Sequence, residues 1–75
     1  MDKFLLRGAI VRKGFTQETL ARALKMSQNT LSAKILGKSY FDTDEIDKIC
    51  ELLDITDNEE KAQIFLSAPS RNRDN

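Results

Sequence analysis

Residues 26–35, MSQNTLSAKI, carry side chains that can read the edge of a nucleic-acid base. Gln28 and Asn29 each end in an amide that donates and accepts hydrogen bonds at once, which matches the major-groove edge of adenine. Ser32 and Ala33 are small, so a helix that carries them can approach closely, and alanine can contact a thymine methyl group. This segment therefore predicts a helix whose polar side faces a partner.

The residue types that most enzymes use are scarce in this chain. It has no histidine and one cysteine, Cys50. Ser-His and Cys-His nucleophiles are therefore excluded, zinc has too few ligands, and no Gly-rich phosphate loop is found. We expect no enzyme, no cofactor and no metal site. A lone cysteine and the lack of a long apolar run fit a cytoplasmic protein with no membrane contact.

The net charge of zero hides an uneven distribution of charge along the chain. Residues 1–41 contain eight lysines and arginines against two acids, whereas residues 42–75 contain four against ten. This split indicates a basic face for a polyanion and an acidic face turned away from it. For the acidic half, a solvated helix surface is the simpler interpretation, because the first turns of helices favour acids.

Capping signals predict an all-α fold, a compact five-helix bundle. The first helix covers residues 3–13, and Gly14 is suited to the left-handed position just past its end. In the fourth and fifth helices a glutamate three residues after the cap completes a capping box. We expect one domain over residues 1–67, with Pro69 ending the last helix and a disordered polar tail over residues 68–75. The expected N-caps of helices two to five are Thr16, Ser27, Asp42 and Thr56.

Apolar spacing predicts a core in which Ile10 lies against Ile35. The other expected core residues are Leu6, Leu20, Leu24, Leu31, Ile46, Ile49 and Leu53. The residues of the fifth helix expected to face inward are Ala62, Phe65 and Leu66. Three apolar residues fall outside this helical spacing. They are either ordinary exposed side chains or part of a contact between two copies of the protein. These are Leu5, Leu52 and Ile64.

Only two residues separate Leu24, the last apolar residue of the second helix, from the Ser27 cap. Such a short turn cannot lay the second and third helices side by side, so they must cross steeply, as in a helix-turn-helix. In that arrangement the second helix of the pair offers one side to the major groove of DNA.

Residues 16–37, TQETLARALKMSQNTLSAKILG, resemble the phage repressor and Cro (Xre-type) family of helix-turn-helix proteins. The resemblance extends over about residues 4–66. It implies a lambda-repressor-like DNA-binding domain and a transcription regulator from a phage or prophage. It also implies that Gln17 contacts a phosphate and that Gln28 reaches a base.

The sequence departs from the family pattern at two places. Lys25 replaces a glycine in the turn. Either the lysine is left-handed there, at a cost of about 1 kcal/mol, or the turn differs slightly from that of the family. Ile10 and Ile35 replace an arginine and a glutamate that form a buried ion pair in many members. Because losing one partner of such a pair is costly while replacing both is not, the joint change supports the alignment.

We expect a Cro-like or repressor-like regulator that acts as a homodimer on double-stranded operator DNA. Lys34 and Lys38 are expected to contact phosphates, because the acid-free segment 19–41 offers them no local partner. For Arg7, Arg12 and Lys13, phosphate contact and solubility are equally good interpretations. The alternative function is an anti-repressor or modulator that binds a partner repressor protein. The expected DNA-binding residues are Thr16, Gln17, Gln28, Asn29, Ser32, Ala33, Lys34 and Lys38.

Overall fold

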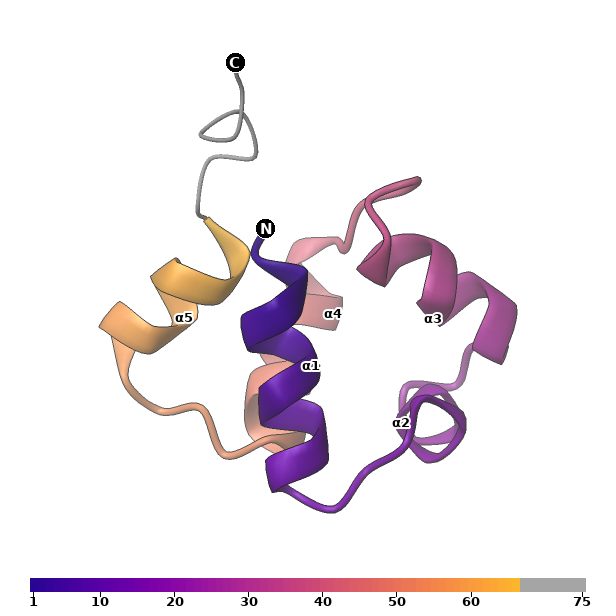
Figure 1. The fold of residues 1–75 in the computed structure, drawn as a ribbon, viewed down its shortest axis with the longest axis horizontal. Coiled ribbons are helices and arrows are strands. Elements are labelled where there is room, and N and C mark those ends of the chain that lie inside the picture. Colours follow the sequence, from indigo (N-terminus) through magenta and orange to yellow (C-terminus); the bar gives the residue numbers. More distant parts are fainter. Residues whose placement is uncertain (67–75) are drawn as a thin grey trace.

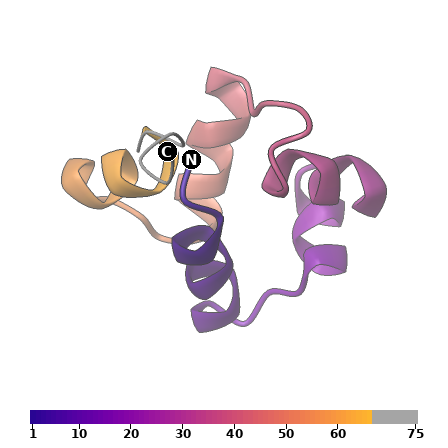
Figure 2. The ribbon, with the colours of Figure 1, turned by 45° about the horizontal axis from the view of Figure 1, so that its top comes forward.

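A computed structural model describes residues 1–66, which form five helices and no strand. The all-α class is therefore confirmed. In both views, α1 and α4 lie between α5 on one side and the α2–α3 pair on the other (Figures 1 and 2). The last helix ends at Phe65, before the predicted end at Pro69, and Pro69 and the predicted tail lie outside the described residues. The helices are α1 (Lys3–Arg12), α2 (Gln17–Ala23), α3 (Gln28–Ile35), α4 (Thr43–Leu52) and α5 (Asn58–Phe65).

Three of the four predicted N-caps are confirmed by side-chain hydrogen bonds. The hydroxyl oxygens of Thr16 and Ser27 accept from backbone N–H groups three residues on, at 3.1 and 3.0 Å. Asp42 Oδ1 accepts from the Glu45 backbone N–H at 2.7 Å, and Glu45 Oε1 accepts from the Asp42 backbone N–H at 3.0 Å. The capping box predicted for α4 is thus present.

The predicted cap of α5 was wrong. The N-cap is Asp57 instead of Thr56, and its carboxylate accepts from the Glu59 backbone N–H at 3.0 Å. Because α5 begins at Asn58, Glu59 lies too close to the cap to complete a capping box. An ionised carboxylate is a stronger acceptor for the free N–H groups of a helix end than a neutral hydroxyl.

The first four helices end in the same way, with a residue of positive φ directly after the C-cap. These residues have φ of 83° at Gly14, 61° at Lys25, 86° at Gly37 and 60° at Asp54. After α2, the Lys25 N–H donates to Arg22 O at 3.1 Å and the Met26 N–H donates to Ala21 O at 3.0 Å. This is the Schellman hydrogen-bond pattern, and it makes a left-handed residue necessary at position 25.

Lys25→Gly should raise the free energy of unfolding by about 1 kcal/mol, because glycine adopts a positive φ without steric penalty. Lys25→Ala is the matched control, since it removes the same charge but keeps the Cβ atom. Urea unfolding followed by far-UV circular dichroism measures both. Equal stability of the two variants would show that the left-handed backbone of residue 25 stores no strain.

One continuous core joins all five helices, and the predicted burial of Ile10 and Ile35 is confirmed. Their side chains are 3% and 1% exposed. Two expected core residues, Leu24 and Ile46, are only half-buried at its edge. The buried residues are Leu6, Ala9, Ile10, Leu20, Ala21, Leu31, Ile35, Ile49, Cys50, Leu53, Ile55 and Ile64.

The expected inward face of α5 needs correction. Ile64 is 2% exposed and belongs to the core, whereas Leu66 is 75% exposed. The Asp2 N–H donates to Ile64 O at 2.7 Å, which places the end of α5 beside the start of α1. Ile64 is therefore not accessible for a contact between copies, while Leu52 is half-buried and Leu5 is exposed.

Candidate nucleic-acid interface

The α2–α3 pair has the steep crossing that the short turn predicts. Figure 1 shows α2 end-on, while α3 lies across the view. Leu24 is the C-cap of α2 and Ser27 is the N-cap of α3, so only residues 25 and 26 join the two helices. Met26 packs against the core, which anchors the turn between the two helices.

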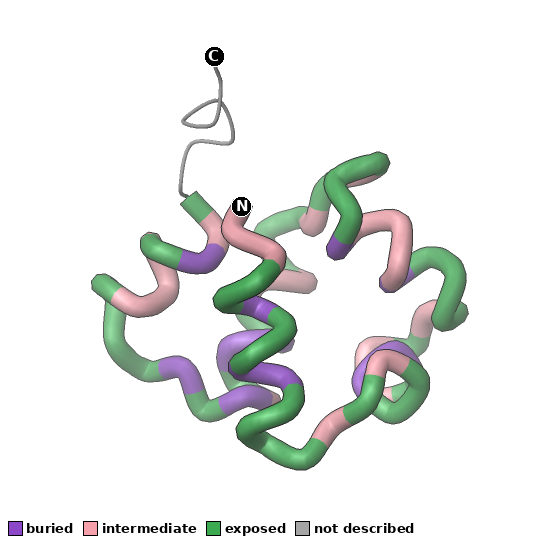
Figure 3. The backbone as a smooth tube through the Cα atoms, in the orientation of Figure 1, coloured by how far each residue is buried: buried purple, intermediate pink, exposed green. Residues whose placement is uncertain are grey.

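Opposite sides of α3 face the core and the solvent. Leu31 and Ile35 are 0% and 1% exposed, and they hold the helix against the core. Gln28 and Asn29 are both exposed in its first turn. The tube of α3 accordingly alternates between exposed and covered stretches (Figure 3). The two amides predicted to read bases are therefore free to meet a partner at the N-terminal end of α3.

Other predicted site residues lie along the same helix and at the start of α2. Ser32 and Ala33 are half-buried, so they allow close approach but offer little surface. Thr16 is exposed and its hydroxyl is occupied with capping α2, while Gln17 is half-buried in the first turn. The structure thus brings most of the predicted set to the α2–α3 pair.

Lys34 has a partner within the protein, contrary to the expectation from the acid-free segment. Its Nζ lies 3.2 Å from Glu45 Oε1 and donates to Tyr40 O at 2.8 Å. The ammonium also lies 5.9 Å from the ring centroid of Phe41. The Lys34 side chain is only 15% exposed, so it ties α3 to the first turn of α4 rather than facing solvent. The sequence did not predict this pair, because Glu45 lies beyond the acid-free segment and only folding brings it close to Lys34.

Lys38 remains a suitable phosphate contact. It is exposed just past the end of α3 and has no ion pair within residues 1–66. Its backbone N–H donates to Ala33 O at 2.9 Å, and Gly37 provides the left-handed residue that this turn needs. The base of the Lys38 side chain is therefore fixed relative to α3 by local hydrogen bonds.

The charge split of the sequence is partly neutralised by ion pairs between the two halves. Arg12 Nη2 lies 3.2 Å from Glu60 Oε2, and Lys13 Nζ lies 3.2 Å from Asp54 Oδ2. Phosphate contact was one of two interpretations for Arg12 and Lys13, and the structure instead pairs both side chains with acids of the second half. Arg7 differs, because it is exposed and has no ion pair in the described part of the chain.

Cys50 is a titratable residue that packs in the core. Burial raises the pKa of the Cys50 thiol, which therefore stays protonated at neutral pH. Its side chain is 8% exposed within the core, as expected for a small apolar residue. No helix within residues 1–66 is long and apolar enough to cross a membrane.

The fold is all-helical, and in its steeply crossed α2–α3 pair the helix α3 presents two side-chain amides to solvent. Residues 1–67 match the family described as "Protein of unknown function (DUF739)", and the chain belongs to this family. That description assigns no activity. No curated protein and no solved structure gives a significant match to the chain.

Proposed function

We propose that the protein is a sequence-specific DNA-binding transcription regulator, Cro-like or repressor-like, from a phage or prophage. The observation that carries this proposal is the exposure of Gln28 and Asn29 in the first turn of α3. Leu31 and Ile35 anchor the opposite side of the same helix in the core. In a helix-turn-helix, the N-terminal residues of the second helix are the ones that contact base edges.

The resemblance of residues 16–37 to phage repressor and Cro proteins supports the same function. In the proposed complex α3 enters the major groove, while Gln17 and Lys38 contact the phosphate backbone on either side of it. A homodimer would place two such helices on a pseudo-palindromic operator, one helical turn of DNA apart. Lys34 takes no part in this contact, because its ammonium is held by Glu45.

Gln28→Ala should weaken binding to the operator by about 1 to 3 kcal/mol and relax the preference at one base pair. Lys38→Ala should instead weaken binding to all sequences alike. Both side chains are exposed, so both variants should keep the wild-type circular dichroism spectrum. The operator is located first by gel shift on DNA that flanks the gene, and each variant is then titrated on operator and random duplexes.

The comparison of the two duplexes decides the role of Gln28. Equal losses of Gln28→Ala on operator and random DNA would make Gln28 a backbone contact. No loss on either duplex would mean that α3 does not read DNA.

A second candidate function is that of a modulator that binds a partner repressor protein. Phe4 and Val11, both on α1, are each 72% exposed, and exposed apolar side chains that share one side of a helix are suited to a contact with a protein. They lie two helical turns apart on one side of the helix. Co-elution with a repressor in the absence of DNA, together with no DNA binding at low salt, would favour this function over the first.

A further inference from the structure

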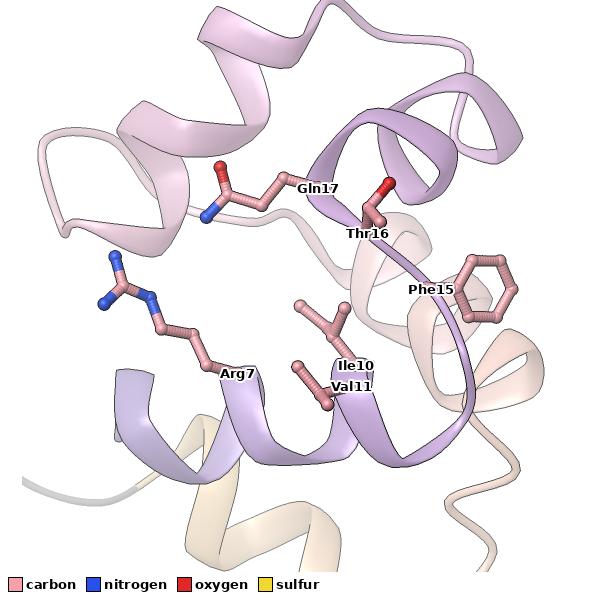
Figure 4. A pocket seen from close by; sticks show the side chains of 6 residues that line it. All are labelled: Arg7, Ile10, Val11, Phe15, Thr16 and Gln17. Atoms are coloured by element: carbon pink, nitrogen blue, oxygen red, sulfur yellow. The ribbon is translucent and has the colours of Figure 1, made fainter.

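A depression lies between α1 and the start of α2, beside the proposed DNA-binding surface (Figure 4). Its walls come from one face of α1 and from the segment that leads into α2, so only folding assembles it. The residues that line it are Arg7, Ile10, Val11, Phe15, Thr16 and Gln17. The set contains one cation, two polar side chains and three apolar ones, and no acid.

Arg7 is the only arginine of residues 1–66 without an ion pair. Arg12 is paired with Glu60, and Arg22 is paired with Glu18 at 3.3 Å. In Figure 4 the Arg7 guanidinium and the Gln17 amide extend from two different helices into the same opening. A guanidinium and an amide NH2 group that face one opening can donate to the same anion.

We propose that Arg7 and Gln17 together bind one phosphate of the DNA backbone. The guanidinium fork matches the geometry of phosphate oxygens, and the apolar side chains around it reduce competition from water. Because Gln17 also belongs to the surface proposed for DNA, this contact is continuous with that surface and extends it from α2 and α3 to α1. The inference rests on the proposed DNA-binding function and adds a residue from a third helix to it.

The test compares Arg7→Gln with Arg12→Gln, since both variants remove one positive charge from an exposed arginine of α1. A phosphate contact is independent of sequence, so a random double-stranded DNA is a sufficient probe. Affinity is measured by fluorescence anisotropy over a series of salt concentrations. The proposed homodimer carries two Arg7 side chains and would lose two phosphate contacts, so Arg7→Gln should weaken binding several-fold and reduce the steepness of log affinity against log salt by about two. Arg12→Gln should keep the wild-type slope.

Two further variants separate a bidentate contact from general attraction. Arg7→Lys keeps the charge but loses the fork, so it should recover the salt slope while binding more weakly than the wild type. Gln17→Ala should cost less in the Arg7→Gln background than in the wild type, because the two residues share one phosphate.

The outcomes distinguish this inference from the proposed function. If the wild type binds DNA with salt dependence and Arg7→Gln matches it, the Arg7 contact is refuted while DNA binding stands. Equal losses for Arg7→Gln and Arg12→Gln would also refute it, because the effect would then be one of overall charge. If the wild type itself shows no DNA binding at low salt, the proposed function fails, and this inference fails with it.

Discussion

Ile35→Glu is expected to lower the free energy of unfolding by about 3 to 5 kcal/mol, which is enough to unfold much of so small a protein. Ile35 is 1% exposed, and the buried residues around it are apolar, so the new carboxylate would have no partner. Ile10→Arg should be costly for the same reason, because Ile10 is 3% exposed in the same core. Urea unfolding followed by far-UV circular dichroism measures both variants.

The double variant Ile10→Arg/Ile35→Glu tests why the two isoleucines occur together. If the two sites face each other, the introduced charges form an ion pair, and the double variant should be markedly more stable than the sum of the two losses predicts. Ile10→Arg combined with Ile49→Glu is the matched control, because it buries the same charges at a different pair of core sites. Additive losses at positions 10 and 35 would show that these side chains do not interact.

The second large effect concerns DNA binding, which should be strongly dependent on salt. If a dimer contacts about six phosphates, affinity should fall about a thousandfold between about 50 and 200 mM salt. The cations available for this are those without internal partners, above all Arg7 and Lys38, because Lys34 is engaged with Glu45. Fluorescence anisotropy with a random duplex gives the slope without knowledge of the operator.

Lys61→Gln provides the control for this experiment. Lys61 lies in α5 and pairs with Asp47 of α4 at 3.3 Å, so its removal should leave the salt dependence of DNA binding unchanged. An affinity that stays flat across the salt range, or no binding at low salt, would contradict the proposed function. Such a result would direct attention to the exposed apolar residues of α1 and a protein partner.

The local signals of the sequence were sufficient to predict the five helices and most of their N-caps. Thr16, Ser27 and Asp42 cap their helices through hydrogen bonds that span three residues, and spacing alone reveals such bonds. The family resemblance left two alternatives for Lys25, a left-handed residue or a different turn, and the hydrogen bonds at the end of α2 show the left-handed residue. The exposed amides of α3 were predictable because the periodicity of a helix separates them from Leu31 and Ile35. The cap of α5 was missed because two adjacent residues, Thr56 and Asp57, both have capping side chains.

Tertiary structure decided which charges are free and which apolar residues of α5 are covered. Lys34 meets Glu45 only because α4 folds back beside the end of α3, and Ile64 is buried because α5 docks against the start of α1. Arg7 and Gln17 likewise come together only when α1 and α2 pack. A helix fixes the relations among residues three or four positions apart, whereas contacts between helices depend on packing angles that no local spacing encodes. The sequence by itself therefore determined the helix that presents the amides. Only the folded arrangement determined which cations lie near that helix without an internal partner.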